Sequence, residues 1–204
     1  FGNPHATVVV LDATCLERNL NLALQILEVT RNVVICVNLI DEAQRKKIKV
    51  NLKRLSEMLG VPVIGTNARD GIGLNELKDA ILELVTNKVA LKPLKISYDS
   101  KIEEAINLLE PAVAALIKDK INSRWISLRL LDSDASFRKA IIHYLGFDLA
   151  LSEVLANNLI SAQNLIISDN NEIRDQLVES IVNLAENIAT DSVTYETKHY
   201  NQLD

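Results

Sequence analysis

The sequence predicts an α/β fold, a parallel sheet with flanking helices, followed by an all-α helical domain. Before about residue 90, short apolar runs alternate with helical patterns, and repeated β-α-β spacing of this kind gives right-handed crossovers between parallel strands. After the linker-like segment Lys92-Pro93-Leu94-Lys95, helical periodicity continues to the tail without a convincing strand. We therefore expect two domains, residues 1–91 and residues 92–204.

Three apolar runs are the predicted strands: residues 6–11, 33–37 and 61–65. Their near-continuous apolar character is typical of strands that are covered on both faces. Between the first two strands, Thr14-x-x-Glu17 predicts a capping box at the start of an amphipathic helix. Asp12, which ends the first strand, is expected to be a cap or turn residue rather than a ligand.

Three more helices are expected before the linker, the first of them short. Asp41-x-x-Gln44 can begin the short helix. The next helix shows its apolar face at Leu52, Leu55, Met58 and Leu59, and Gly60 is placed to end it. After the loop Gly71-Ile72-Gly73, the amphipathic pattern of residues 74–85 predicts the last helix of the first domain.

The second domain reads as a series of helices. Ser100-x-x-Glu103 is expected to begin the first of them, and Pro111 should kink it or split it in two. Shorter helices are predicted at residues 123–131, 135–145 and 151–160, and Asp169-x-x-Glu172 is expected to cap a long one. Trp125 is expected to be a core anchor. The polar tail from residue 191 is expected to fray or to run extended.

Composition limits the classes of protein that this chain can represent. The 204 residues are 48% hydrophobic and 24% charged with a net charge of −5, which argues against a nucleic-acid-binding surface. No apolar run approaches the ~20 residues that span a bilayer, and no signal peptide is visible. Cys15 and Cys36 lie in apolar sequence and are expected to be reduced packing residues, and the histidines show no metal-ligand spacing. Because the chain begins at Phe1, we expect it to be part of a longer protein.

Polar residues follow the second and third predicted strands where each strand ends, and parallel sheets bind ligands at that edge. A carboxylate such as Asp41 can accept from both the ring N–H and the amino group of guanine, a pair of donors that adenine does not offer. The amide of Asn38 can donate to a purine ring nitrogen and brace the neighbouring loop. There the backbone N–H of Ala68 is placed to reach the guanine carbonyl oxygen, while Thr66 and Asn67 shape the turn.

The pattern Asn-x-x-Asp is common, and alone it usually marks the start of a helix. Its place at a strand end, with Ala68 at the end of the next strand, favours the base-reading interpretation. Gly71 or Gly73 would supply the permissive backbone beside it. No Gly-x-x-x-x-Gly-Lys-Ser/Thr segment occurs, so the sequence predicts the base-reading half of a nucleotide site without its phosphate-binding half.

Several segments resemble the ferrous iron transport protein B (FeoB) family. Residues 12–20 resemble its Asp-Ala-x-x-Leu-Glu-Arg-Asn-Leu segment, and Asn38-Leu39-Ile40-Asp41 is similar to its guanine-specificity motif. Thr66-Asn67-Ala68-Arg69 falls where the family usually shows Ser/Thr-Ser-Ala-Arg. Residues 124–131 resemble an Arg-Trp-x-x-x-Lys-Leu-Leu element of its helical domain. Leu39 stands where most GTPases carry lysine, and Asn67 stands where serine is usual.

The resemblance implies a cytosolic part of a membrane protein that takes up ferrous iron. Residues 1–91 would be the second half of a P-loop-GTPase-like G domain, and residues 92–204 the helical domain that leads toward the membrane segment. The implied ligand is GTP or GDP, with Asn38, Asp41, Thr66, Asn67 and Ala68 at the base. The phosphate-binding loop, the switches and the Mg²⁺ ligands would precede Phe1. The implied location is the cytoplasmic face of the cell membrane, with this piece itself soluble and the transporter's own membrane domain as its partner.

Two consequences and two alternatives follow. Without a phosphate cradle this chain is not expected to hydrolyse GTP. In G domains the strand at residues 6–11 pairs with the strand that precedes the phosphate loop, so its edge should be open here and available for self-association. One alternative is a different soluble GTPase, such as a ribosome-assembly or RNA-modifying factor. The other is a non-enzymatic helical interaction or scaffold module.

Overall fold

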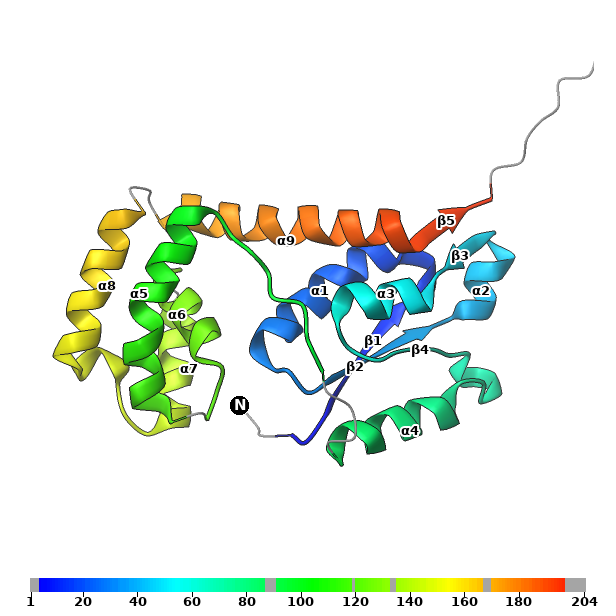
Figure 1. The fold of residues 1–204 in the computed structure, drawn as a ribbon, viewed down its shortest axis with the longest axis horizontal. Coiled ribbons are helices and arrows are strands. Elements are labelled where there is room, and N and C mark those ends of the chain that lie inside the picture. Colours follow the sequence, from blue (N-terminus) through cyan, green and yellow to red (C-terminus); the bar gives the residue numbers. More distant parts are fainter. Residues whose placement is uncertain (1–3, 87–90, 119, 133–134, 167–169, 197–204) are drawn as a thin grey trace, which may run out of the picture. The chain divides into compact units, whose positions relative to one another are not determined.

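A computed structural model describes residues 4–86, 91–118, 120–132, 135–166 and 170–196 (Figure 1). The chain forms two compact units. The sheet unit holds His5–Leu27, Arg31–Leu94 and the chain from Asn183 onward, and the helical unit holds Lys95–Val182 together with Glu28–Thr30. The unit boundary after Leu94 lies close to the predicted one, but the end of the chain groups with the sheet rather than with the helices.

The elements follow one another as β1 (Thr7–Asp12), η1 (Ala13–Cys15), α1 (Leu16–Val29), β2 (Val33–Asn38), α2 (Ile40–Arg45), β3 (Ile48–Val50), α3 (Leu52–Leu59), β4 (Val63–Gly65), η2 (Ala68–Asp70), α4 (Leu74–Val85), α5 (Ser100–Ile117), α6 (Ser123–Leu131), α7 (Ala135–Leu145), η3 (Leu149–Leu151), α8 (Glu153–Leu165), α9 (Asn170–Ser192) and β5 (Val193–Tyr195). The η elements are single 3₁₀ turns. The predicted α/β fold with a following helical part is confirmed.

Three parallel strands in the order β1-β2-β4 form the main sheet, with Asp12 opposite Asn38 and Val37 opposite Gly65. Each strand is apolar and β-branched, which suits a pleated and buried surface. In Figure 1, α4 lies on one side of these strands, and α1 and α3 lie on the other. The carboxyl ends of β1, β2 and β4 therefore share one edge, where the candidate residues were expected.

The outer strand β1 is covered on one face only. Val9 and Leu11 are buried, whereas Val8 and Val10 are 37% and 58% exposed. Val8 is opposite Val34, and Val34 packs against Ala80 and Leu84 of α4. Paired residues of neighbouring strands share a face, so α4 covers β2 and leaves this face of β1 open. The expectation that every strand is covered on both faces is therefore wrong for β1.

The helix starts of the two units differ from the sequence expectation in a consistent way. The predicted capping boxes at Thr14 and Ser100 do not form as written. Asp12 accepts from the Thr14 N–H, and Asp99 accepts from the Lys101 N–H. In each case the cap is an aspartate that precedes the predicted Ser or Thr, because its short carboxylate reaches the free N–H groups of the first turn. Asp12 is therefore a cap, as expected for it, whereas Asp99 was not predicted.

A second, antiparallel pair of strands was not predicted. β3 pairs with β5, with Lys49 opposite Thr194. The tail was expected either to fray or to run extended, and it is extended over Val193–Tyr195. Residues 197–204 lie outside the described part.

In the helical unit α5 packs against α6 and α8. The bounds of α6 and α7 match the prediction, and α8 begins two residues later than expected. Pro111 lies inside α5, which continues as one element from Ser100 to Ile117, so the predicted split does not occur. Trp125 is half-buried and meets the Phe137 ring edge-on, with the centroids 5.4 Å apart. The expected cap at Asp169 lies outside the described residues.

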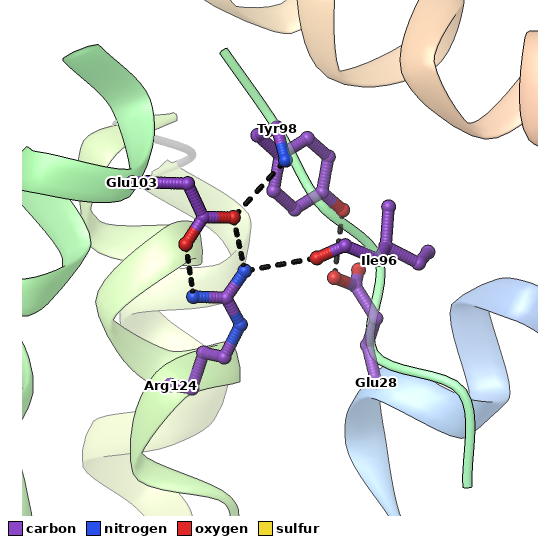
Figure 2. A network of polar contacts seen from close by, with 5 residues as sticks. All are labelled: Glu28, Ile96, Tyr98, Glu103 and Arg124. Carbon is purple, nitrogen blue, oxygen red and sulfur yellow. Dashed lines mark hydrogen bonds and ion pairs between the residues drawn. The ribbon is translucent and has the colours of Figure 1, made fainter. Parts of the chain in front are cut away.

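A polar network joins the start of α5 and α6 to the segment before them (Figure 2). Arg124 donates to both carboxylate oxygens of Glu103, at 2.8 and 2.6 Å, and to the Ile96 carbonyl oxygen at 3.0 Å. Glu103 Oε1 also accepts from the Tyr98 N–H, and the Tyr98 hydroxyl donates to Glu28 Oε1 at 2.7 Å. This network fixes the chain from Ile96 to Tyr98 as it enters the helical unit.

Candidate functional site

The candidate site begins where β2 ends. Asn38 is the last residue of β2, and Asp41 lies in the first turn of α2. Between them, Leu39 has φ of +62°, a left-handed conformation that non-glycine residues rarely adopt. This turn lets the chain pass from strand to helix within two residues, so that both polar side chains belong to the same sheet edge.

Asn38 connects this turn to the end of β4. Its Oδ1 accepts from the Thr66 hydroxyl at 3.0 Å and from the Ala68 N–H at 3.1 Å. The backbone ties the two loops further, because the Thr66 N–H donates to the Val37 carbonyl at 2.8 Å. The amide nitrogen of Asn38 has no partner among the described residues, so its two N–H donors remain available to a ligand.

Asp41 carries an unsatisfied buried oxygen. Its Oδ1 is shielded from solvent and has no hydrogen-bond partner in the described part of the chain. Its Oδ2 accepts from Arg45, one turn later on α2, at 3.0 Å. Arg45 is mostly exposed and also pairs with Glu42, so its ion pair with Asp41 stabilises the fold by at most about 1 kcal/mol. A buried acceptor without a donor is costly, and a ligand that supplies a donor would remove that cost once the carboxylate turns to present this oxygen.

The loop after β4 is held by its own hydrogen bonds. Asn67 forms an isolated bridge with Ile72, and its amide donates to Asp70 at 2.5 Å. Thr66 and Asn67 are both buried, whereas Ala68 is exposed. Gly73 has a φ of +78°, and a Cβ there would overlap the carbonyl oxygen of Gly65. Of the two glycines considered for this turn, Gly73 is therefore the one whose missing side chain the close packing requires.

The structure brings Asn38, Thr66 and Ala68 into direct contact, and it places Asp41 on the helix that begins beside them. The Ala68 N–H, expected to reach a guanine carbonyl, is engaged by Asn38 in this structure. A base carbonyl at that position would have to share this donor.

Two residues of the site were not identified from the sequence. Cys36 lies two positions before Asn38 on β2, and its Sγ is 3.3 Å from the Thr66 hydroxyl oxygen. Since Thr66 donates to Asn38, the Cys36 thiol is the donor in its own contact with Thr66. Arg45 is the other, and its spacing of four residues from Asp41 was a signal that could have indicated it. Cys15, expected in apolar surroundings like Cys36, is exposed.

Two features are absent from the described residues. Among them, no three His, Cys, Asp or Glu side chains lie close enough together to hold a metal ion. In the same part of the chain, none of the helices has the length and apolarity of a membrane span.

Comparison with known families gives matches to both units. A family model for ferrous iron transport protein B matches residues 1–81, and a model for the FeoB cytosolic helical domain matches residues 98–194. A Porphyromonas gingivalis protein named Fe(2+) transport protein A/Fe(2+) transporter FeoB fusion protein is 35% identical over 150 residues, which are 68% of this chain and 17% of that protein. An Fe(2+) transporter FeoB of Legionella pneumophila is 28% identical over 195 residues, 95% of this chain and 24% of that protein. The chain thus spans less than a quarter of either relative.

Solved structures with the same arrangement of elements are cytosolic domains. The cytosolic domain of the T. maritima FeoB iron transporter in its apo form superposes with a TM-score of 0.67 at 27% identity, covering 95% of this chain and 69% of that one. A GDP form of the same domain gives the same TM-score at 28% identity and the same coverage.

Proposed function

This chain belongs to the ferrous iron transport protein B family, as part of its G domain followed by the cytosolic helical domain, and we propose that its sheet unit selects guanine nucleotides through Asn38 and Asp41. The observation that carries this proposal is the buried Oδ1 of Asp41, which has no donor in the described structure. A guanine base supplies two adjacent donors, the ring N–H and the amino group. Two carboxylate oxygens on one side chain match that pair.

The neighbouring groups support the same ligand. The free amide N–H groups of Asn38 can donate to a purine ring nitrogen, while its Oδ1 keeps the loop after β4 in place. The second oxygen of Asp41 becomes available when the exposed Arg45 side chain leaves Asp41 and keeps only its ion pair with Glu42. The chain offers acceptors where guanine has donors, and this complementarity excludes adenine.

The nucleotide bound by relatives supports the proposal. The T. maritima cytosolic domain has been solved in GDP and GMPPNP forms, and the chain covers two thirds of it. For this chain we propose GTP or GDP as ligand, binding without hydrolysis, because the sequence holds no phosphate-binding loop. In the longer protein, the chain would lie at the cytoplasmic face of the membrane and contribute to uptake of ferrous iron together with a membrane domain.

Competition against a fluorescent GDP analogue tests guanine selectivity. GDP should displace the probe, and ADP should not at the same concentration. The variant Asp41→Asn replaces one acceptor with a donor, so it should lose GDP and gain affinity for xanthosine diphosphate, whose carbonyl stands in place of the guanine amino group. Asp79→Asn, an exposed carboxylate on α4, is the matched control and should bind GDP like the unmodified chain.

Equal competition by ADP, or unchanged GDP binding by the Asp41→Asn variant, would contradict base selection by Asp41. Absence of any binding at saturating probe would leave the scaffold function as the better account of this chain.

A further inference from the structure

The end of the chain is hydrogen-bonded to the strand that follows the candidate base site. β5 pairs antiparallel with β3, and Figure 1 shows the end of α9 leading directly into this pair. The pairing is extended at both ends: the Asn51 N–H donates to the Ser192 carbonyl at 2.7 Å, and the Glu196 N–H donates to the Lys47 carbonyl at 3.0 Å. We call β3, β5 and these four flanking residues the β3–β5 clasp.

Side chains reinforce the clasp. Arg54 of α3 donates to Asp191 at 2.9 Å across a separation of 137 residues, and Lys49 forms an ion pair with Glu196. Ser192 is 2% exposed, and Val193, the first residue of β5, is buried as well. Backbone pairing, buried contact and two ion pairs therefore hold the end of α9 to one place on the sheet unit.

The clasp begins where the base-reading helix ends. α2 carries Asp41 and has only six residues, with left-handed Leu39 before it and left-handed Lys47 after it. Lys47 is also the residue whose carbonyl accepts from Glu196. Since α2 packs against β3 and shares this turn with it, a shift of α2 moves the acceptor that the clasp uses.

We propose that guanine occupancy at Asp41 and closure of the β3–β5 clasp are coupled. This inference rests on the proposed function, because it takes the guanine base as the group that donates a hydrogen bond to Asp41 Oδ1. A base bound there holds α2 in one position, and this in turn holds the Lys47 turn that follows α2. The Lys47 carbonyl then stays in place to accept from Glu196, which favours the pairing of β5 with β3. By thermodynamic reciprocity, opening the clasp weakens guanine binding by the same factor. The first part of α9 groups with the helical unit and its end with the sheet unit, so this coupling acts on an element that both units share.

The mechanical step can be tested without nucleotide, by hydrogen exchange on the whole chain. Thr194 is exposed and lies opposite Lys49, so Thr194→Pro removes a strand N–H with little loss of side-chain packing. Thr194→Val keeps the N–H and is the matched control. In the Thr194→Pro variant, amides of α2 should exchange about five-fold faster or more, while those of α4 in the same unit stay unchanged. Faster exchange confined to residues 193–196 would overturn the link between the clasp and α2.

A milder pair of variants guards against misfolding. Lys49→Glu places two carboxylates side by side and should accelerate exchange in β5 and α2, and the double variant Lys49→Glu with Glu196→Lys should restore the original rates. Failure of the second substitution to restore α2 would count against the clasp.

The nucleotide step is tested with GDP. In the unmodified chain, GDP should slow hydrogen exchange at residues 193–196, and this effect should vanish in the Asp41→Asn variant. The Thr194→Pro variant should bind GDP more weakly than the unmodified chain, by up to about five-fold. Guanine-selective binding with no change at β5, and equal affinity of the Thr194→Pro variant, would overturn the coupling while base selection stands. If GDP does not bind, base selection fails, and the coupling to nucleotide fails with it, even where the exchange of α2 shows the mechanical link.

Discussion

At the scale of single residues, Asn38 organises the candidate site with one oxygen. Its Oδ1 accepts from two donors of the loop after β4, the Thr66 hydroxyl and the Ala68 N–H. This double acceptance sets the orientation of the amide, since the nitrogen must then face away from the loop. Thr66 is itself buried and receives a hydrogen bond from the Cys36 thiol, so two side chains in a row, Thr66 and then Cys36, support the amide.

Removal of the Thr66 hydroxyl should therefore disturb binding as well as folding. Thr66→Val keeps the shape of the side chain but loses the donor to Asn38, so we expect a loss of about 1 kcal/mol in the free energy of unfolding and a several-fold weaker affinity for GDP. Urea denaturation and nucleotide titration measure the two effects. Thr66→Ser keeps the hydroxyl and loses a methyl group, so it should lose stability but keep its affinity. Equal affinity of the Val and Ser variants would show that the hydroxyl does not position Asn38.

In the network of Figure 2, the Glu28 carboxylate and the Tyr98 hydroxyl make the stability of the fold depend on pH. Burial raises the pKa of Glu28 above the ordinary 4.5, although the Tyr98 hydroxyl that donates to it acts in the opposite direction. Burial and the Glu28 carboxylate also raise the pKa of Tyr98, so that hydroxyl stays protonated and remains a donor. A raised carboxyl pKa means that folding favours the protonated form. The favourable contribution is present at low pH and is lost as the pH rises through the pKa of Glu28.

Glu28→Gln keeps an acceptor for Tyr98 and removes the charge. Relative to the unmodified chain, it should gain stability near pH 7, and the gain should disappear as the pH falls below 4.5, where Glu28 is protonated in both the folded and unfolded states. Urea denaturation at several pH values measures the difference. Glu28→Leu, which leaves the Tyr98 hydroxyl without this acceptor, should be destabilised by about 1–3 kcal/mol at every pH. A gain for Glu28→Gln that is constant with pH would contradict the role assigned to the charge.

At the scale of elements, local patterns predicted what local forces decide. The helices α4, α6 and α7 have the bounds that their apolar periodicity predicts, and Gly60 ends α3 with φ of +67° as expected. The caps were misplaced by one or two residues because Asp, Ser and Thr compete for the same N–H groups. β3 and β5 were missed because each has three residues and gains its stability from a partner far away in the chain.

At the candidate site, too, sequence patterns predict positions but not the contacts between loops. Strand ends and residue types placed Asn38, Asp41 and the Thr66–Ala68 loop on one edge, since parallel topology fixes that edge. The left-handed turn at Leu39 and the engagement of the Ala68 N–H by Asn38 depend on how two loops meet. No pattern within either segment encodes such contacts.

Pro111 offers a prediction about one element. It lacks the N–H that an interior helical residue donates, yet α5 continues through it because the buried face on either side packs in the helical unit. Pro111→Ala should therefore stabilise the chain by about 2 kcal/mol, the cost of interior proline less its restriction of the unfolded chain. Urea denaturation measures the gain. Ala112→Gly, a substitution at the adjoining position, should destabilise by up to about 1 kcal/mol. A destabilised Pro111→Ala variant would mean that α5 depends on the geometry that proline imposes.

At the scale of the whole molecule, β1 is the outer strand of the main sheet. Within the described residues β1 pairs with β2 alone, so one row of its N–H and C=O groups faces outward. The face of β1 that α4 does not reach exposes Val8 and Val10 beside that row. An open edge with an apolar face is a template for strand pairing with another chain. Charge does not oppose such pairing strongly, since the net charge of −5 is spread over 204 residues.

We therefore expect the isolated chain to self-associate through β1, with a molar mass by light scattering that rises with concentration. Val10→Lys places a charge on the most exposed position of the apolar face and should shift the chain toward monomer, because pairing would now bury an unpaired ammonium group. Leu22→Lys is the matched control, since Leu22 is 52% exposed in the same unit but belongs to helix α1 and not to the edge strand. Its molar mass should follow that of the unmodified chain. If both lysine variants reduce association equally, general surface hydrophobicity is the cause, and the edge of β1 has no special role.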